Sequence, residues 1–268
     1  MPPAPGASCP PLPPIPALTG ERTWPDIPAE TYWFTRHVAC YRWAASILAT
    51  DLAGREPPTG NPAPVLDAGS GEGYGASELS RATHRPVVGV ELDASTALHA
   101  STRYPELNQT RANLVALPFR TSAFAAAVSF QVVEHIWDPL TYLRELTRCT
   151  DGPVLISTPN RPVHSPGLPP GGRPDNPFHV REFDAQELSA LLNESDPERT
   201  PTLFGLRHGP TITSWEKQNG SLPAALASAP PSKAALTFAE SVTADDFIIE
   251  EIDPPVRDLS VHDLIALW

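Results

Sequence analysis

The sequence has little cysteine, few basic side chains and no long apolar run, and each shortage excludes a class of protein. Its three cysteines, Cys9, Cys40 and Cys149, are odd in number, widely spaced and form no C-x-x-C pair. Neither a disulfide framework nor a zinc site fits such spacing. We therefore expect reduced thiols and a cytoplasmic protein.

Basic residues are outnumbered, with 19 lysines and arginines against 31 aspartates and glutamates, for a formal net charge of −12. They form no cluster along the chain, whereas contacts to nucleic-acid phosphates need one. We expect no nucleic-acid partner. No apolar run reaches the roughly eighteen residues of a membrane span, and the N-terminus lacks the basic start and apolar centre of a signal peptide.

Proline, in contrast, is abundant, and ten of the 34 prolines fall within residues 1–28. Few large apolar side chains accompany them, so this stretch cannot bury enough surface to offset the entropy of ordering it. We predict a disordered tail over residues 1–29. Residues 30–268 suit one α/β domain with a full core.

A helix is predicted within residues 30–60. Apolar side chains recur there every three or four residues, which places them on one helical face: Phe34, Val38, Tyr41, Ala45, Leu48 and Leu52. The aromatic Tyr32, Trp33 and Trp43 lie off this face. They could either roof a pocket or cover the edge of a sheet.

The most informative motif is residues 65–75, Val-Leu-Asp-Ala-Gly-Ser-Gly-Glu-Gly-Tyr-Gly. An apolar run breaks into glycines at alternate positions, and a helical pattern then begins near Ala76. Glycine has no Cβ and adopts positive φ freely, so a ligand can approach bare backbone there. The motif indicates a nucleotide-type site around Gly69, Ser70, Gly71 and Gly73.

A second β-rich run, residues 85–93, begins about one helix length after the glycines. It ends in an acidic residue. A carboxylate at that position can accept hydrogen bonds from both ribose hydroxyls. Glu91 is therefore the ribose candidate, with Asp93 in reserve.

The identity of the nucleotide depends on Asp67. Gly71, Gly73 and Ala76 also fit the dinucleotide pattern G-x-G-x-x-A, so an NAD-dependent oxidoreductase is one alternative. However, Asp67 would face a pyrophosphate with like charge. A cofactor with a sulfonium and an ammonium group suits Asp67 better, which favours S-adenosyl-L-methionine (SAM). A non-catalytic SAM-binding protein is a third hypothesis.

Strands and helices alternate along the chain, which predicts an α/β fold with a doubly wound parallel sheet. We expect strands at 65–66, 85–93, near 113–114, 124–130 and 152–159, and helices at 76–81, 94–103, 140–148, 186–193 and 222–242. Three later runs, 201–207, 247–252 and 263–268, are also strand-like, and their order stays open. Ligands collect at the carboxyl ends of such strands, where polar candidates should converge: Asp67, Glu91, Asn113, Gln131, Glu134, His135 and Asn160.

Five of these segments together resemble class I SAM-dependent methyltransferases over residues 65–161: VLDAGSGEGYG, VVGVELD, LPF, SFQVVEHIWDP and ISTPNR. The resemblance implies a Rossmann-like, mostly parallel seven-stranded sheet with helices on both faces. Four flanking pieces, residues 30–37, 176–183, 205–210 and 263–267, resemble the mycofactocin oligosaccharide methyltransferase branch.

Cofactor residues follow from the motif and the resemblance together: Asp67, Gly69, Ser70, Gly71, Gly73, Glu91, Leu92, Asn113, Leu114, Phe130 and Gln131. A buried Arg36 could pair with the methionyl carboxylate. In ubiquinone-pathway O-methyltransferases a similar segment, Glu-Val-Val-Glu-His, is associated with a divalent metal. Gln131 replaces the first Glu here, so Glu134 and His135 would supply only two ligands, and we expect no metal.

The implied activity is O-methylation of a small molecule, namely a sugar of the mycofactocin oligosaccharide, with a phenol or quinone-type acceptor as the alternative. A hydroxyl acceptor benefits from a positioned base. His135 is the first candidate because it follows the fourth strand, and His179 is the second, followed by His37 and His164. We expect residues 160–183 to form a substrate loop and residues 208–242 a helical cover.

Overall fold

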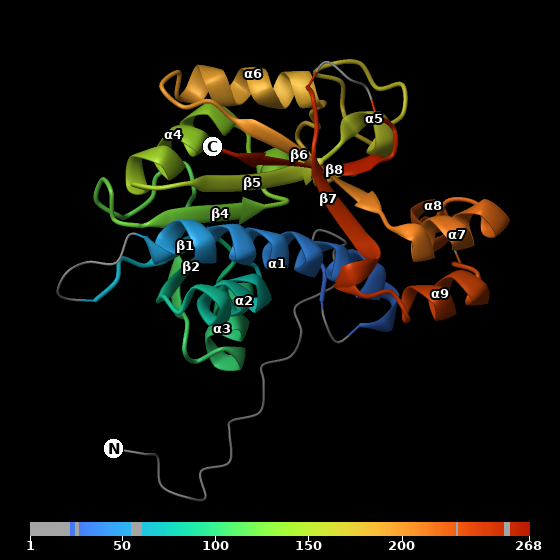
Figure 1. Cartoon of the computed structure of the whole chain (residues 1–268), viewed down its shortest axis with the longest axis horizontal. Coiled ribbons are helices and arrows are strands. Elements are labelled where there is room, and N and C mark those ends of the chain that lie inside the picture. The colour runs from blue at the N-terminus through green and yellow to red at the C-terminus, as the bar shows by residue number, and fades with distance from the viewer. Residues whose placement is uncertain (1–21, 25–26, 55–60, 229, 255–257) are drawn as a thin grey trace, which may run out of the picture.

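The computed structural model describes residues 22–24, 27–54, 61–228, 230–254 and 258–268. Within these residues the strands are β1 Val65–Ala68, β2 Val87–Glu91, β3 Asn108–Arg111, β4 Ala126–Phe130, β5 Val154–Pro159, β6 Thr202–His208, β7 Phe247–Glu251 and β8 Val261–Leu267. They form one sheet in the order β3-β2-β1-β4-β5-β8-β6-β7 (Figure 1). Neighbours among β1 to β5 pair in parallel, whereas β8 is antiparallel to both β5 and β6, and β7 is antiparallel to β6.

The helices are α1 Thr31–Ala53, α2 Tyr74–Thr83, α3 Ala94–Arg103, α4 Pro139–Cys149, α5 Arg161–His164, α6 Ala185–Ser195, α7 Pro210–Asn219, α8 Leu222–Ala227 and α9 Lys233–Ala239. Short 3-10 turns are η1 Pro28–Glu30, η2 Val133–His135 and η3 Ala244–Asp246. Helices α1 and α2 cover one face of the sheet, and α4 and α6 cover the other (Figure 1). The predicted doubly wound α/β fold is confirmed.

The strand count differs from the seven expected, because the described sheet has eight. All three C-terminal runs are strands, and β8, the last in sequence, is the inner one. Strand β3 also begins earlier than the segment expected near Asn113. Its residues, Asn-Gln-Thr-Arg, are polar and partly exposed at the sheet edge, so they carry no apolar signal.

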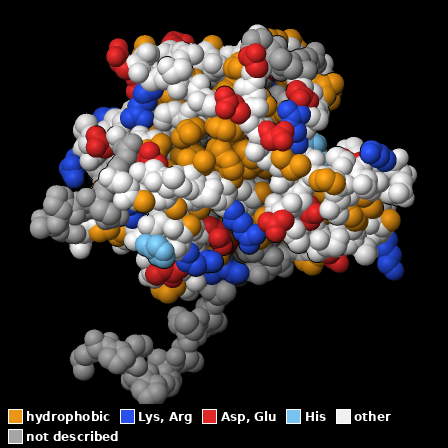
Figure 2. Space-filling model, viewed as in Figure 1, with side chains coloured by type: hydrophobic (Ala, Val, Ile, Leu, Met, Phe, Trp, Pro, Cys, Tyr) orange, Lys and Arg blue, Asp and Glu red, His pale blue; other side chains and the backbone are white. Residues whose placement is uncertain are grey.

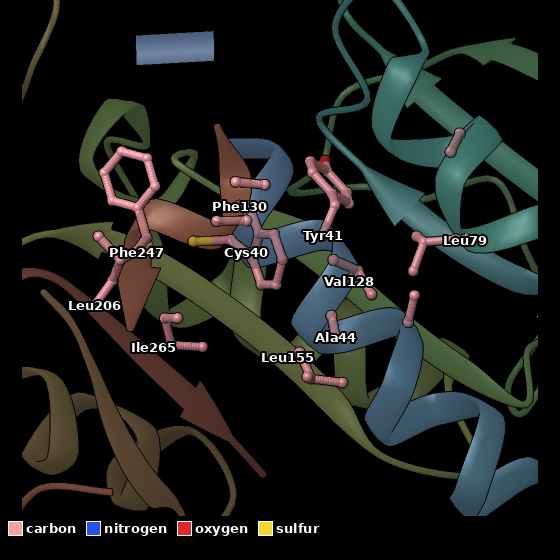
Figure 3. Packing of buried hydrophobic residues seen from close by; sticks show 14 of the residues in the cluster. Cys40, Tyr41, Ala44, Leu79, Val128, Phe130, Leu155, Leu206, Phe247 and Ile265 are labelled. Atoms are coloured by element: carbon pink, nitrogen blue, oxygen red, sulfur yellow. The ribbon is translucent and has the colours of Figure 1, made fainter. Parts of the chain in front are cut away.

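The core lies on both faces of the sheet because successive strand residues point to opposite sides. Val65 and Leu155 pack with α1 and α2, while their neighbours Leu66 and Ile156 pack with α4 and α6. Figure 3 shows Tyr41 and Ala44 of α1 lying over Phe130, Val128 and Leu155. Helix α1 is thus a structural cover of the central strands.

The three aromatic residues off the α1 stripe cover the sheet. Tyr32 is fully buried, and its hydroxyl lies 2.6 Å from Nε2 of His208 in β6. Trp33 packs against Tyr32, and Trp43 packs against Phe204 of β6. Of the two alternatives, the structure therefore favours the sheet cover over the pocket roof.

Part of the predicted tail has a defined place. Trp24 is only 3% exposed and packs edge-to-face on His99 of α3. For residues 22–24 the prediction of disorder is wrong, because one large aromatic side chain finds a buried contact. Residues 1–21 lie outside the described residues, as does Cys9, whereas Cys40 and Cys149 are free, buried thiols.

The predicted helical cover forms α7, α8 and α9, which gather beyond one end of β6 and β7 (Figure 1). None of the helices formed by the described residues has the length and apolarity that a membrane span needs. On the face drawn in Figure 2, acidic and basic side chains are interspersed, and hydrophobic side chains gather near the centre.

Candidate active site

The glycine motif forms a left-handed turn between β1 and α2. The backbone N–H groups of Gly69 and Ser70 both donate to the Val90 carbonyl, at 2.8 and 2.9 Å, which ties the turn to β2. Gly69, Gly71 and Gly73 have φ angles of 84°, 53° and 96°, a region that side chains disfavour. A Cβ on Gly69 would also lie 2.4 Å from Cγ2 of Val132. The turn therefore requires glycine on steric grounds.

A cavity of about 230 Å³ opens beside this turn, where the strand order reverses between β1 and β4. Ligands bind at such switch points in doubly wound sheets. The cavity is lined by Arg22, Gly69, Gly71, Val90, Glu91, Leu92, Asn113, Leu114, Gln131, Val132, His135 and Ile136.

A smaller cavity of about 70 Å³ shares Arg22, Gly69, Gly71 and Gln131 with the first. It adds Thr23, Trp24, His37, Tyr41, Ser70, Glu72, Tyr74 and Phe130. The two cavities are therefore two lobes of one elongated site. Nine of the predicted cofactor residues line one lobe or both: Gly69, Ser70, Gly71, Glu91, Leu92, Asn113, Leu114, Phe130 and Gln131.

Glu91 ends β2 with a side chain directed into the larger lobe. One carboxylate oxygen, Oε1, accepts from the Asp93 backbone N–H at 2.8 Å and from Arg22 Nη2 at 3.1 Å. Asp93, the second ribose candidate, is instead the N-cap residue of α3, because its Oδ1 accepts a hydrogen bond from the Thr96 N–H. Hydrogen bonds from the Ser95 hydroxyl and from the N–H and hydroxyl of Thr96 hold the pKa of Asp93 well below its usual range. Of the two acids, Glu91 is the one at the cavity.

Asp67 lies beneath the turn and is fully buried. Its Oδ1 accepts from the Tyr41 hydroxyl at 3.0 Å, while Oδ2 has no hydrogen bond among the described residues. Burial raises the pKa of Asp67 to about 7, against the lowering effect of the Tyr41 hydroxyl. Tyr41 also lines the smaller lobe. It therefore connects that lobe to the Asp67 carboxylate, of which one oxygen has no hydrogen bond among the described residues.

Gln131 follows β4 and lines both lobes. It has a φ of 56°, which is uncommon for a residue other than glycine. Its backbone N–H donates to the Ser157 carbonyl at 3.0 Å, and its side-chain Nε2 donates to Ser157 Oγ at 3.1 Å. Such strain is retained where the surroundings enforce it, and it is found preferentially at functional sites.

Three predicted cofactor residues line neither lobe, namely Asp67, which lies beneath the turn, Arg36 and Gly73. Arg36 is buried, but its Nε lies 2.9 Å from Oδ2 of Asp263 and its guanidinium lies over the Trp33 ring. The prediction that Arg36 pairs with a methionyl carboxylate is therefore wrong, because Asp263 already compensates its charge. Gly73 lies at the N-cap of α2, where a Cβ would meet the Tyr104 ring at 3.0 Å.

Two histidines meet at the edge of the larger lobe. The rings of His135 and His179 pack edge-to-face with centroids 5.0 Å apart. His135 Nδ1 lies 2.9 Å from the Phe178 carbonyl oxygen, and His179 Nδ1 lies 2.7 Å from Oε1 of Glu182. Only His135 lines the cavity. No sequence pattern indicates the Glu182 contact, which depends on how residues 160–183 fold back.

The remaining histidine candidates are poor bases. Burial lowers the pKa of His37 and of His164 to about 3 in each case. His37 contacts the Tyr74 hydroxyl at 2.9 Å, and His164 contacts the His262 carbonyl at 3.1 Å.

The predicted convergence of polar residues is partly correct. Glu91, Asn113, Gln131 and His135 line one cavity. Asn160 does not join them, because it lines a separate cavity of about 360 Å³ and donates from Nδ2 to the Val261 carbonyl of β8. Sequence reasoning missed Arg22 at the cavity, since nothing distinguishes it within a proline-rich stretch.

Comparison with known proteins gives the family. Residues 66–152 match a family model described as "Methyltransferase domain". A protein of Mycolicibacterium smegmatis is 38% identical over 264 residues, which cover 96% of this chain and 95% of that one. A protein of Mycobacterium tuberculosis H37Rv is 38% identical over 243 residues, or 87% of this chain and 82% of that one. Both are named "Probable S-adenosylmethionine-dependent methyltransferase". This chain belongs to the SAM-dependent methyltransferase family.

The fold agrees with that assignment. A chain in the solved complex of the Haloferax volcanii Trm112 methyltransferase activator with a methyltransferase aligns with a TM-score of 0.50 at 13% identity, covering 87% of this chain and 96% of that chain. The protein is thus an enzyme with SAM as its cofactor. The NAD-dependent oxidoreductase and the non-catalytic hypotheses are wrong, because the whole-length relatives are methyltransferases by name.

The site residues suit this cofactor. A buried carboxylate oxygen of Asp67 lacks a partner among the described residues, which suits a positively charged ligand. Bare backbone at Gly69 and Gly71 leaves room for close approach, and a carboxylate at Glu91 suits paired hydroxyls.

Proposed function

We propose that this methyltransferase methylates a hydroxyl oxygen of a small glycan-bearing molecule, namely a sugar of the mycofactocin oligosaccharide. The four flanking segments that resemble that branch support the proposal, because three of them meet in space. Tyr32 of α1 contacts His208 of β6 at 2.6 Å, and Arg36 of α1 pairs with Asp263 of β8. The fourth segment carries His179, which packs on His135.

The polarity of this region also supports a sugar acceptor. Asp263 is fully buried and interacts with the Gln131 side chain as well as with Arg36. Gln131 lines both lobes, and Asn113 and His135 line the larger one, so polar side chains lie at the wall of the cavity. Side-chain amide and imidazole groups offer the acceptors and donors that sugar hydroxyls require.

Different residues around the two lobes would contact different parts of the cofactor. Glu91 would accept from the ribose hydroxyls, while Asn113 and Leu114 would contact the adenine. Asp67 would balance the positive charge of the methionine end, with Phe130 and Gln131 nearby. When bound, SAM supplies an electrophilic methyl group on a sulfonium, and holding the acceptor hydroxyl against it accounts for much of the rate.

His135 would accept the hydroxyl proton, and the observation that carries this role is the contact of its Nδ1 with the Phe178 carbonyl, at 2.9 Å. A carbonyl only accepts, so Nδ1 carries the hydrogen and the lone pair lies on Nε2. His135 also lines the larger lobe. A histidine in this tautomer can take a proton near neutral pH. His179 is the second candidate, oriented by Glu182.

Transfer of labelled methyl from SAM to the mycofactocin oligosaccharide tests the proposal. We expect His135→Gln to lower kcat by about 10²- to 10⁴-fold, the usual contribution of a positioned base, and to leave the affinity for S-adenosylhomocysteine unchanged. The control is His84→Asn, at an exposed left-handed position at the end of α2, which asparagine tolerates.

Two results would change the assignment. Labelling of a phenol but not of the oligosaccharide would move the acceptor to another class. An unchanged kcat in His135→Gln would remove His135 as the base without affecting the cofactor site.

A further inference from the structure

Glu134, His135 and His179 form a compact cluster at the edge of the cofactor cavity. One ligand atom from each lies within 4.8 Å of the other two. Glu134 and His135 belong to η2, directly after β4, whereas His179 comes from the long segment after β5. The cluster thus joins two segments that are distant in sequence.

Glu134 is an unusual member because it is 1% exposed. Its Oε2 accepts from the Thr158 hydroxyl at 3.0 Å. Its Oε1 is buried and has no hydrogen bond among the described residues. A buried carboxylate oxygen left in this state needs an explanation, and a bound cation is one.

Both histidines carry their lone pair on Nε2. Each donates its Nδ1 hydrogen, His135 to the Phe178 carbonyl and His179 to Glu182, so the lone pair of each lies on Nε2. Nε2 of His135 lies 4.0 Å from Glu134 Oε1. Nε2 of His179 accepts from the Asn176 amide at 3.0 Å, a contact that a cation would replace.

Glu182 adds a feature typical of metal sites. Metal-binding histidines usually donate their second ring hydrogen to a carboxylate or a carbonyl, which fixes the tautomer and orients the ring. His179 has a carboxylate partner and His135 a carbonyl partner.

We propose that Glu134, His135 and His179 bind a divalent transition-metal ion such as Zn²⁺ or Co²⁺. Two imidazoles and one carboxylate suit these ions better than Mg²⁺ or Ca²⁺, which prefer oxygen ligands. The sequence predicted only two ligands, because Gln131 replaces a glutamate. The third comes from His179, which folds back from another segment.

This inference rests on the proposed function, because it assigns the cation a place beside the acceptor. A divalent ion there would polarise the acceptor hydroxyl and ease the loss of its proton, whereas in the metal-free enzyme His135 would accept that proton itself. Ligand atoms about 2 Å from one ion lie roughly 3.3 Å apart in a tetrahedral site. The three ligand atoms, which lie within 4.8 Å of one another, would therefore close by up to about 1.5 Å on binding.

Titration of the chelator-treated full-length protein with Co²⁺, followed by its visible d–d absorption, tests the site. We expect one equivalent to bind the wild type. Glu134→Gln, His135→Gln and His179→Gln should each lower the affinity at least tenfold, and Glu182→Gln should lower it about 10- to 100-fold, the usual effect of losing an orienting carboxylate. His84→Asn is the matched control and should bind Co²⁺ like the wild type.

The affinity for S-adenosylhomocysteine, measured on the same samples, reports folding and separates the two proposals. Equal Co²⁺ affinity in the wild type and in folded Glu134→Gln and His179→Gln would overturn the metal site and leave only a hydrogen-bonded cluster. If the metal-free wild type still transfers methyl to the oligosaccharide at its full rate, the metal has no role in the reaction and the proposed function stands. Failure of the metal-loaded wild type to methylate any sugar would instead overturn the proposed function.

Discussion

At the scale of single residues, Asp67 is a buried carboxylic acid directly beneath the glycine turn of the candidate cofactor site. Its carboxyl is enclosed by Tyr41 of α1, by the start of α2 at Ala76 and, at longer range, by Glu91 of β2. Burial favours the neutral acid, and its pKa rises to about 7. A positively charged cofactor would favour the carboxylate, so cofactor binding should release a proton from Asp67.

The affinity for SAM should therefore depend on pH. Below about pH 7 Asp67 is protonated in the free protein, and part of the free energy of SAM binding is used to remove that proton. The affinity for SAM should therefore rise by up to about tenfold per pH unit as the pH increases toward 7, and then level off. In the free protein the raised pKa acts on stability. Between about pH 4 and 7 the folded state holds a proton on Asp67 that the unfolded state has lost. The contribution of Asp67 to the free energy of unfolding therefore falls as the pH rises through this range.

Calorimetric titration with SAM between pH 5.5 and 8 checks this linkage. Asp67→Asn, which keeps an acceptor for the Tyr41 hydroxyl, should bind more weakly and lose this part of the pH dependence. A pH profile that is the same in Asp67→Asn and in the wild type would show that another group is responsible.

Single residues of the site differ in how far the sequence predicts them. Glu91 and Asn113 follow strands, so topology alone brings them to the cavity edge. Arg22 and the His179–Glu182 contact depend on chain segments without regular structure, which carry no periodic signal. Arg36 was mispredicted because its partner, Asp263, lies in β8, whose place in the sheet the sequence left open.

At the scale of elements, α1 and α2 pack so closely that one position must be glycine. A Cβ on Gly75 would lie 2.1 Å from Cζ of Tyr41, a distance that no small shift relieves. The same Tyr41 supports Asp67 and lines the smaller lobe. This packing therefore connects the helix interface to the cofactor site.

Gly75→Ala should destabilise the protein despite the higher helix propensity of alanine. The propensity gain is at most about 1 kcal/mol, whereas overpacking costs about 1–3 kcal/mol, occasionally more. Urea unfolding gives the free energy of unfolding. The control is Gly54→Ala, where a Cβ meets nothing within 4 Å and the change should stay within about 0.5 kcal/mol. Equal effects of the two substitutions would contradict the close packing.

Elements themselves were predicted best where capping and apolar periodicity agree. Residues 94–103 were expected as a helix and form α3, which Asp93 caps. In β3 the polar residues gave no signal. The order of β6, β7 and β8 was also out of reach, because all three are short and β-rich and their pairing is set by tertiary contacts.

At the scale of the whole molecule, β8 closes the fold. It lies between β5 and β6, so the last strand in sequence joins the parallel half of the sheet to the antiparallel end. It also carries Asp263 toward Arg36 and Gln131. The C-terminal strand therefore packs behind Gln131, which lines both lobes of the candidate site.

Ile265→Ala in β8 should lower the free energy of unfolding by about 2–5 kcal/mol, the usual cost of such a truncation in a core. Ile265 is fully buried, whereas Ile248 of the edge strand β7 is 37% exposed. Ile248→Ala is therefore the matched control and should cost about 1 kcal/mol or less. A larger loss for Ile248→Ala, measured by chemical denaturation, would mean that β7 and not β8 is the inner strand.

We propose that the turn after β1 and the carboxylate that ends β2 together hold the adenosyl cofactor. Calorimetric titration of S-adenosylhomocysteine into the wild type, Glu91→Gln and the exposed control Glu240→Gln tests it most directly. We predict one site in the wild type, an affinity about 10- to 100-fold lower in Glu91→Gln, as expected for hydrogen bonds to a charged group, and no change in Glu240→Gln. Equal affinity in Glu91→Gln and the wild type, or no binding to the wild type, would contradict the account.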